Sequence, residues 1–155
     1  MTAEPTYELE ISRLFDAPRE LVYQAFVDPD QLAQWFGPVG WVVPRDTVDV
    51  DARPGGYQRF VMVNADDPSQ RSPINATFTE VVANELLVGE QSVEGIPGFE
   101  GTARLTLRLE FHDEPGGKTR LELRQGPFSH QLEENSRGGW NSSFGKLDDL
   151  LAARS

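Results

Sequence analysis

Cysteine is absent from this chain of 155 residues. Its absence excludes disulfide bonds, thiolate nucleophiles and metal sites built from cysteine. Lysine is scarce as well, with Lys118 and Lys146 alone, and the formal net charge at pH 7 is −11. Because a surface of that sign repels the phosphate backbone, we expect no nucleic-acid partner.

Long apolar runs are also missing. No run approaches the roughly 18 residues that a membrane span needs, so we expect no span. Residues 1–10 hold three glutamates but no basic residue, which argues against a secretory signal and makes the cytoplasm the expected location. Apolar residues still make up 38% of the chain, including nine Phe and three Trp. That suffices for one core, and the length suits a single domain over residues 1–155.

Signatures of catalysis and of metal binding are missing too. His112 and His130 are not at metal-ligand spacing, and we expect a surface or capping role for both. The sequence has no His-Glu-x-x-His string, phosphate-binding loop, nucleophile elbow or dinucleotide fingerprint. The glycine-rich segment 95–101 lacks the lysine and the strand-to-helix context that phosphate binding needs. We therefore expect neither a metal nor a cofactor.

Alternation of apolar and polar residues predicts most of the chain to be strand. The clearest run, residues 102–112, is joined by a glycine-rich turn at 114–117 to the returning run 118–125. Short connections between most of the runs favour an antiparallel meander. The seven predicted strands are 7–15, 47–51, 56–64, 74–82, 86–93, 102–112 and 118–125.

Two short helices are predicted after the first strand. Pro18 opens the first, at a position where its missing N–H costs nothing. Asp28 has the pattern of an N-cap for the second, with Pro29 as the first helical residue and Gln31 as the reciprocal capping partner. Arg13, just before them, falls on the apolar face of the first strand, and we expect it to snorkel at the strand end.

A long helix is predicted over residues 133–153. Trp140, Phe144, Leu147 and Leu151 recur along one face of it. Gly138-Gly139 interrupts it at a cost of about 1 kcal/mol per glycine relative to alanine. We expect the glycines to allow close packing against the sheet, with room kept for a ligand as the alternative.

Strands that are apolar on one face and a helix with one apolar stripe predict an α+β fold. The seven-stranded antiparallel sheet curves, the two short helices follow its first strand, and the long C-terminal helix crosses its concave face. Such an arrangement often leaves a cavity between helix and sheet.

Several local strings occur in an order that matches a known family. The strings are residues 13–22, Asp28-Pro29, Trp35-Phe36-Gly37-Pro38, Arg53-Pro54-Gly55-Gly56, Phe78-Thr79-Glu80-Val81 and Gly139-Trp140. In these strings the chain resembles the activator of heat-shock-protein-90 ATPase homologue family. This family lies within the START-like (Bet v 1-like, SRPBCC) superfamily, and the resemblance implies its helix-grip fold. Bacterial single-domain members of the family look like small-ligand binders or accessory proteins.

Large apolar side chains are expected to converge on the space between sheet and helix. Phe99, in its glycine-flanked loop, is expected to act as a lid. Glu80 is the one catalytic candidate, because a carboxylate sharing the face of Phe78 would be buried and its pKa raised. Glu80 could equally pair with an arginine or lie in solvent. The candidate ligand-binding residues are Trp35, Phe60, Met62, Phe78, Phe99, Trp140 and Phe144.

We expect the chain to bind a hydrophobic small molecule or lipid-like metabolite. One alternative is a polyketide cyclase/dehydratase-like enzyme, which needs at least two polar side chains inside a closed cavity. Another is a co-chaperone or other interaction module, which needs an exposed apolar patch. Contact with a chaperone and formation of a homodimer are both left open by the sequence.

Overall fold

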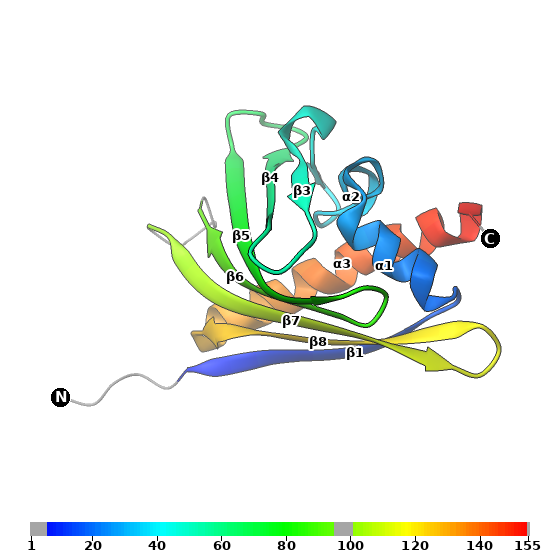
Figure 1. Ribbon diagram of the computed structural model, residues 1–155. Coiled ribbons are helices and arrows are strands. Elements are labelled where there is room, and N and C mark those ends of the chain that lie inside the picture. The colour runs from blue at the N-terminus through cyan, green and yellow to red at the C-terminus, as the bar shows by residue number, and fades with distance from the viewer. Residues whose placement is uncertain (1–5, 95–100, 155) are drawn as a thin grey trace.

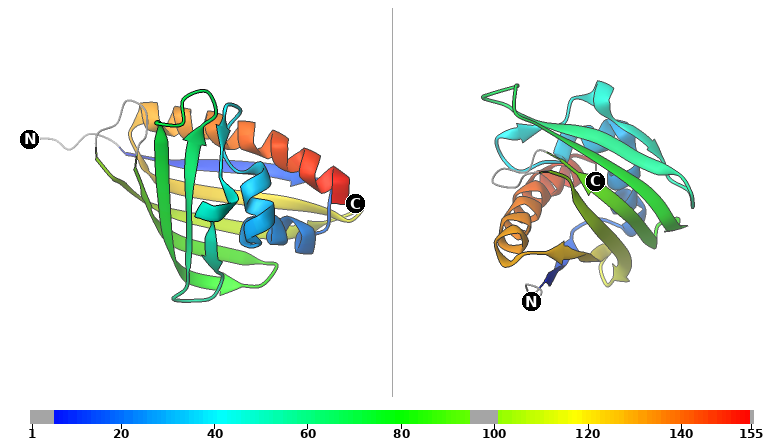
Figure 2. Two further views of the ribbon diagram at one scale, coloured as in Figure 1. Left: turned by 90° about the horizontal axis from the view of Figure 1, so that it is seen from above. Right: turned by 90° about the vertical axis from the view of Figure 1, so that its left-hand side faces the viewer.

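The computed structural model describes residues 6–94 and 101–154. They form one antiparallel sheet of eight strands and a long C-terminal helix, α3 (His130–Arg154). Two shorter helices, α1 (Arg19–Val27) and α2 (Pro29–Trp35), lie beside the C-terminal half of α3 (Figure 1). The end-on view in Figure 2 shows that the sheet curves and that α3 lies on its concave side. The α+β helix-grip fold expected from the sequence is confirmed.

The strands run in the spatial order β1-β8-β7-β6-β5-β4-β2, and β3 also pairs with β4. Every pairing is antiparallel, and β4 to β8 are neighbours in chain order, as the predicted meander requires. The predicted count of seven strands omits β2, whose two residues are too few to show alternation. The bounds are β1 (Tyr7–Phe15), β2 (Trp41–Val42), β3 (Asp49–Asp51), β4 (Tyr57–Asn64), β5 (Arg71–Val82), β6 (Leu86–Val93), β7 (Ala103–Glu114) and β8 (Lys118–Phe128).

The core lies between the concave face of the sheet and the helices. Alternation along each strand sends one row of apolar side chains to that face. Phe144 and Leu147 of α3 are both 0% exposed, and burying each contributes about 1.5–3 kcal/mol. The apolar stripe of α3 therefore holds the helix against the sheet. The inward row of β7 is Ala103, Leu105, Leu107, Leu109 and Phe111.

Arg13 of β1 makes a polar contact between the sheet and α3. Its guanidinium lies 2.5 Å from the carboxylate of Asp148. The guanidinium carbon also lies 5.5 Å from the ring centre of Phe15 and 5.6 Å from that of Phe144. The arginine on the apolar face of β1 thus reaches past two aromatic rings to a partner on α3.

The short helices are tied to each other by side-chain hydrogen bonds. The carboxylate of Asp28 accepts from the backbone N–H of Asp30 at 3.0 Å and from the side-chain amide of Gln31 at 2.9 Å. The indole N–H of Trp35, in α2, donates to the carbonyl of Ala25, in α1, at 2.8 Å. The first two bonds cap the start of α2, and the third holds its last residue against α1, next to the start of the loop 36–40.

Candidate ligand-binding cavity

A cavity of about 380 Å³ lies between α3 and the concave face of the sheet. Phe36, Pro38 and Trp41 close one side of it, at the loop after α2. The wall on α3 consists of Leu132, Asn135, Ser136, Gly139, Trp140 and Ser143. The wall on the sheet consists of Met62, Ser72, Ile74, Gln91, Val93, Leu105, Gln125 and Phe128.

None of the described residues that line the cavity carries a formal charge. Most of them are aliphatic or aromatic, and the polar ones are amides and hydroxyls. Because a buried ion without a partner loses its hydration at a large cost, these walls favour an uncharged occupant.

The loop that closes one side of the cavity is attached to α3 at two points. The backbone N–H of Val39 donates to the hydroxyl of Ser142 at 2.8 Å. The ammonium group of Lys146 donates to the carbonyl of Trp41 at 3.2 Å, and burial lowers the pKa of this lysine. Movement of α3 away from the sheet would therefore break both contacts.

Four hydrogen bonds involve buried polar side chains of the cavity wall, and a fifth is accepted by the exposed side chain of Asn135 from Gln131 at 3.0 Å. The indole N–H of Trp140 donates to Gln125 Oε1 at 2.8 Å, and Gln125 Nε2 donates to Gln91 Oε1 at 2.6 Å. The hydroxyl of Ser143 donates to the carbonyl of Gly139 at 2.9 Å. The hydroxyl of Ser72 donates to the carbonyl of Glu94 at 2.5 Å. Both serine hydroxyls thus give their proton to the backbone.

Gly139 lies on α3 where that helix faces the cavity. A Cβ atom added at Gly139 would meet no atom within 4 Å, and the same is true at Gly138. The expectation that these glycines allow close packing on the sheet is therefore wrong. Because Gly139 lines the cavity while Gly138 is exposed, the alternative of room beside the helix fits Gly139 alone.

The predicted ligand-binding residues fall into four groups. Met62 and Trp140 line the cavity. Phe78 lines only a separate small hollow of about 20 Å³, which Trp140 also borders. Phe99 lies outside the described residues. The remaining three, Trp35, Phe60 and Phe144, do not line the cavity and are at most 2% exposed.

Those three rings pack behind the cavity wall, where they support it. Phe60 meets Phe36 edge-on with ring centres 4.6 Å apart, and Phe144 lies 5.5 Å from Trp140. Periodicity identifies the face on which a side chain lies, but it does not tell the layer that touches a cavity from the layer behind it.

Sequence reasoning missed the two glutamines of the cavity wall. Gln125 continues the inward row of Leu121 and Leu123 on β8, and Gln91 alternates in the same way with exposed Glu90 on β6. A polar side chain at a position that the strand pattern assigns to the interior was the available signal.

Glu80 does not share the face of Phe78. The pairing of β5 with β6 shifts between Phe78 and Glu80, a bulge that reverses the alternation and turns Glu80 outward. Its side chain is 60% exposed and its carboxylate lies 3.8 Å from the guanidinium of Arg108. The buried acid or base considered from the sequence is therefore not present at this position, and the alternative of an arginine partner holds.

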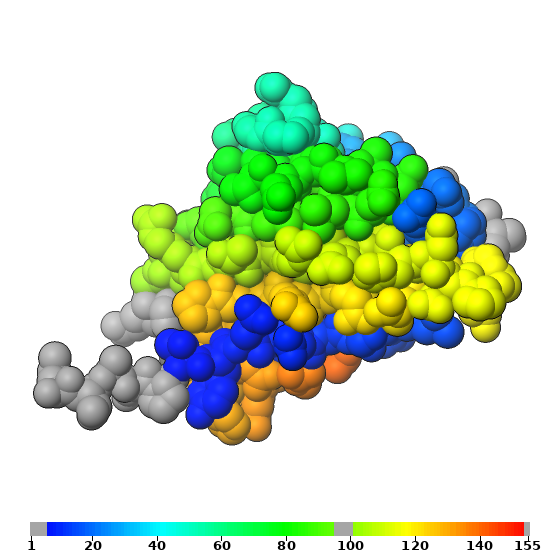
Figure 3. All heavy atoms as spheres, turned by 60° about the horizontal axis from the view of Figure 1, so that its bottom comes forward, coloured from blue at the N-terminus to red at the C-terminus, as the bar shows by residue number. Residues whose placement is uncertain are grey.

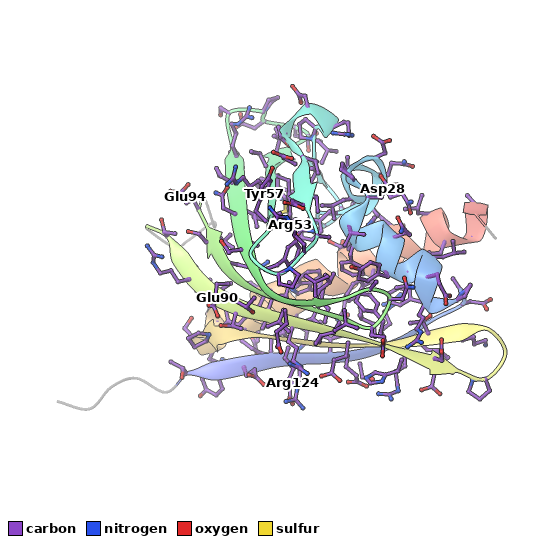
Figure 4. The ribbon with its side chains drawn as sticks, viewed as in Figure 1. Asp28, Arg53, Tyr57, Glu90, Glu94 and Arg124 are labelled. Carbon is purple, nitrogen blue, oxygen red and sulfur yellow. The ribbon has the colours of Figure 1, made fainter. Side chains whose placement is uncertain are left out.

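The outer face of the sheet, by contrast, is charged. Figure 3 shows β1, β8 and β7 side by side on it, and Figure 4 shows Arg124 pointing away from the side of α3. Arg108 also donates to Glu110 at 2.8 Å; this hydrogen bond, together with one to His112, lowers the pKa of Glu110. The charged surface and the uncharged cavity are on opposite sides of one sheet.

The histidines lie apart from the cavity. His112 contacts Glu110 at 3.1 Å, and His130 lies 3.5 Å from Glu134. Within residues 6–94 and 101–154, no three His, Cys, Asp or Glu side chains are grouped as a metal site would require. Across the same residues, no helix is long and apolar enough to cross a membrane.

With the fold and the cavity defined, comparison with known proteins adds the family. The Activator of Hsp90 ATPase homolog 1-like protein family matches residues 16–152. The chain belongs to that family. The match covers α1, α2, the seven described strands that follow β1 (Tyr7–Phe15), and α3 up to residue 152.

Solved bacterial structures resemble this family member over nearly its whole length. Protein CV1439 from Chromobacterium violaceum is 25% identical, with a TM-score of 0.79 over 94% of this chain and 97% of that one. The AHSA1 protein from Silicibacter pomeroyi is 26% identical, with a TM-score of 0.80 over 96% of this chain and 100% of that one. No curated protein matches this chain. The family and the fold are thus shown, and neither names a ligand.

Proposed function

We propose that this protein binds an uncharged, apolar small molecule in the cavity between α3 and the sheet. The observation that carries the proposal is a cavity of about 380 Å³ with no charged side chain among its described lining residues. Sites for small molecules commonly enclose about 300–1,000 Å³ and are lined mainly by apolar groups. An apolar occupant would gain about 25 cal/mol for each Å² removed from water.

The proposal stops at binding because the described cavity wall offers little for proton transfer. General acid–base catalysis needs a titratable side chain within reach of the substrate. The described lining residues include no Asp, Glu, His, Lys or Tyr. A cyclase or dehydratase therefore has no support among them.

An interaction module would be favoured by a continuous apolar patch on the surface. The exposed large apolar side chains of the described residues are distributed over several parts of the fold. They are Tyr7 and Leu14 near opposite ends of β1, Val39 in the loop before β2, Val42 in β2, and Val82 at the end of β5. The cytoplasmic location remains a prediction, and the sequence and the described structure leave open both contact with a chaperone and formation of a homodimer.

The adjacent glycines of α3 allow a controlled test with the neutral dye N-phenyl-1-naphthylamine, whose fluorescence rises in apolar surroundings. Gly139→Leu places a side chain in the cavity, whereas Gly138→Leu places the same side chain on the exposed face of the same helix. Overfilling a site costs about 1–3 kcal/mol, so we expect Gly139→Leu to weaken dye binding about tenfold or more. Gly138→Leu should bind as the wild type does.

Circular dichroism and thermal melts of both variants show whether the fold is kept. Dye binding that is absent from the wild type, or that is equally strong in Gly139→Leu, would contradict binding in this cavity. Equal weakening in both variants would point to a general effect on α3 and count against the proposal.

A further inference from the structure

A line of three side chains joined by hydrogen bonds crosses the cavity wall from α3 to the sheet. Trp140 of α3 donates to Gln125 of β8, and Gln125 donates to Gln91 of β6, at 2.8 Å and 2.6 Å. The two glutamines are 6% and 7% exposed. All three residues line the cavity.

The direction of this line is fixed by its first member. An indole N–H can only donate, so the oxygen of the Gln125 amide must face Trp140. The nitrogen of that amide then faces Gln91 and needs an acceptor there, which is the oxygen of the Gln91 amide. Reversing either amide would bring two donors or two acceptors together. The donor of Trp140 therefore determines that the line ends in the NH₂ group of Gln91.

This NH₂ group donates to no described residue, and although Gln91 is only 7% exposed, the group itself is not closed off from water. An N–H that is removed from water and left unpaired costs free energy, so a ligand that fills the cavity must either pair with it or bear that cost. The other buried polar groups of the wall, Ser72 and Ser143, already give their hydroxyl protons to backbone carbonyls. Gln91 thus offers both N–H groups of its amide to a ligand, whereas Gln125, which donates one N–H to Gln91, retains one.

Resting on the binding function proposed above, we propose that the ligand carries a neutral carbonyl group whose oxygen accepts a hydrogen bond from Gln91 Nε2. A carbonyl only accepts, so it satisfies a donor without bringing a proton that needs a further partner. A carboxylate would also accept, but the described wall has no cation to pair with it, and the chain has a net charge of −11. The inferred ligand class is an apolar ketone, ester or amide.

A competing arrangement exists on the other side of Gln91. This residue also lines the small hollow of about 20 Å³, together with Gln58 and Phe78. A volume of that size is enough for one water molecule. A water held there by Gln91 would satisfy the NH₂ group, and the cavity would then show no preference for a carbonyl.

The inference is tested by calorimetric titration with two rigid compounds of the same outline, 9-fluorenone and fluorene, which differ in a carbonyl in place of a methylene. Fluorene-9-carboxylate is the charged comparison. We expect wild-type protein to bind fluorenone about tenfold more tightly than fluorene, and both more tightly than the carboxylate. In Gln91→Met, which keeps the length of the side chain but removes the donor, the preference for fluorenone should disappear.

Two further variants separate the line of hydrogen bonds from other effects. Trp140→Phe removes the donor that orients both amides, so the preference for fluorenone should shrink while fluorene still binds. Ser12→Ala removes a hydroxyl that donates to Glu122 on the outer face of the sheet, away from the cavity, and it should leave the preference unchanged.

Equal affinity of the wild type for fluorenone and fluorene overturns the inference, as does binding of neither compound or an unchanged preference in Gln91→Met. If both compounds bind equally and both are lost in Gly139→Leu, binding in the cavity stands and only the carbonyl preference fails.

Discussion

Replacing the two glycines of α3 by alanine, one at a time, should stabilise the protein. A Cβ atom at Gly138 or Gly139 would meet nothing within 4 Å, so neither substitution creates a clash. Alanine is favoured over glycine in a helix interior by about 1 kcal/mol. Unfolding entropy of about 2.1 cal/mol/K per residue gives about 0.33 kcal/mol/K for a chain of 155 residues. Each variant should therefore melt about 3 °C above the wild type.

The two substitutions should differ in binding, although they agree in stability. Gly139→Ala adds a methyl group inside the cavity, whereas Gly138→Ala adds one to the exposed surface of α3. Calorimetric melts and urea unfolding measure the first effect, and titration with N-phenyl-1-naphthylamine measures the second. A lower melting temperature for Gly139→Ala would mean that the helix touches the sheet at this point, and the reasoning about room beside Gly139 would be refuted.

Three further changes test the core and the charged outer face. Phe144→Ala should lower the free energy of unfolding by about 3–5 kcal/mol, as measured by urea unfolding, because this ring is 0% exposed; a loss under about 1 kcal/mol would contradict that burial. Thr119→Val should lower it by about 1–3 kcal/mol, because the Thr119 hydroxyl donates to the buried carbonyl of Ala17 at 2.7 Å; an unchanged midpoint would mean that this carbonyl finds another donor. The hydrogen bond from Arg108 holds the pKa of Glu110 below its ordinary range. The ionised Glu110 therefore stabilises the folded protein when the pH is above the ordinary pKa of a glutamate, and this stabilisation is lost as the pH falls from the ordinary pKa to the lowered one. The unfolding free energy of Glu110→Gln should accordingly fall less steeply with acid than that of the wild type, and parallel pH profiles would contradict this.

The long regular elements could be predicted from the sequence because their periodicity repeats over many residues. The sequence predicts paired strands over residues 102–112 and 118–125, and the structure has β7 (Ala103–Glu114) and β8 (Lys118–Phe128) paired in one register. The helix predicted over 133–153 begins three residues earlier, at His130, since helix ends are poorly marked by apolar spacing. The sequence thus predicts the repeating part of each strand or helix, but not the residues at which it begins and ends.

The candidate site depended on details that periodicity does not carry. A single bulge between Phe78 and Glu80 reverses the alternation from Glu80 to the end of β5, and nothing in the local sequence marks it. The roles of Gln91 and Gln125 depend on strands that are not adjacent in the sheet, with β7 between them. The room beside Gly139 could not be predicted from the sequence, because a cavity is formed by residues of several elements that meet only in the folded chain.

The central claim is that a small apolar molecule lies between α3 and the sheet. Intermolecular nuclear Overhauser effects between bound N-phenyl-1-naphthylamine and assigned methyl groups of the protein measure this most directly. We predict contacts from the dye to Met62, Ile74, Leu105 and Leu132, which line the cavity, and none to the exposed methyl groups of Leu14 and Val82. Contacts to the exposed methyl groups, with none to those of the cavity, would place the dye on the surface and contradict the claim.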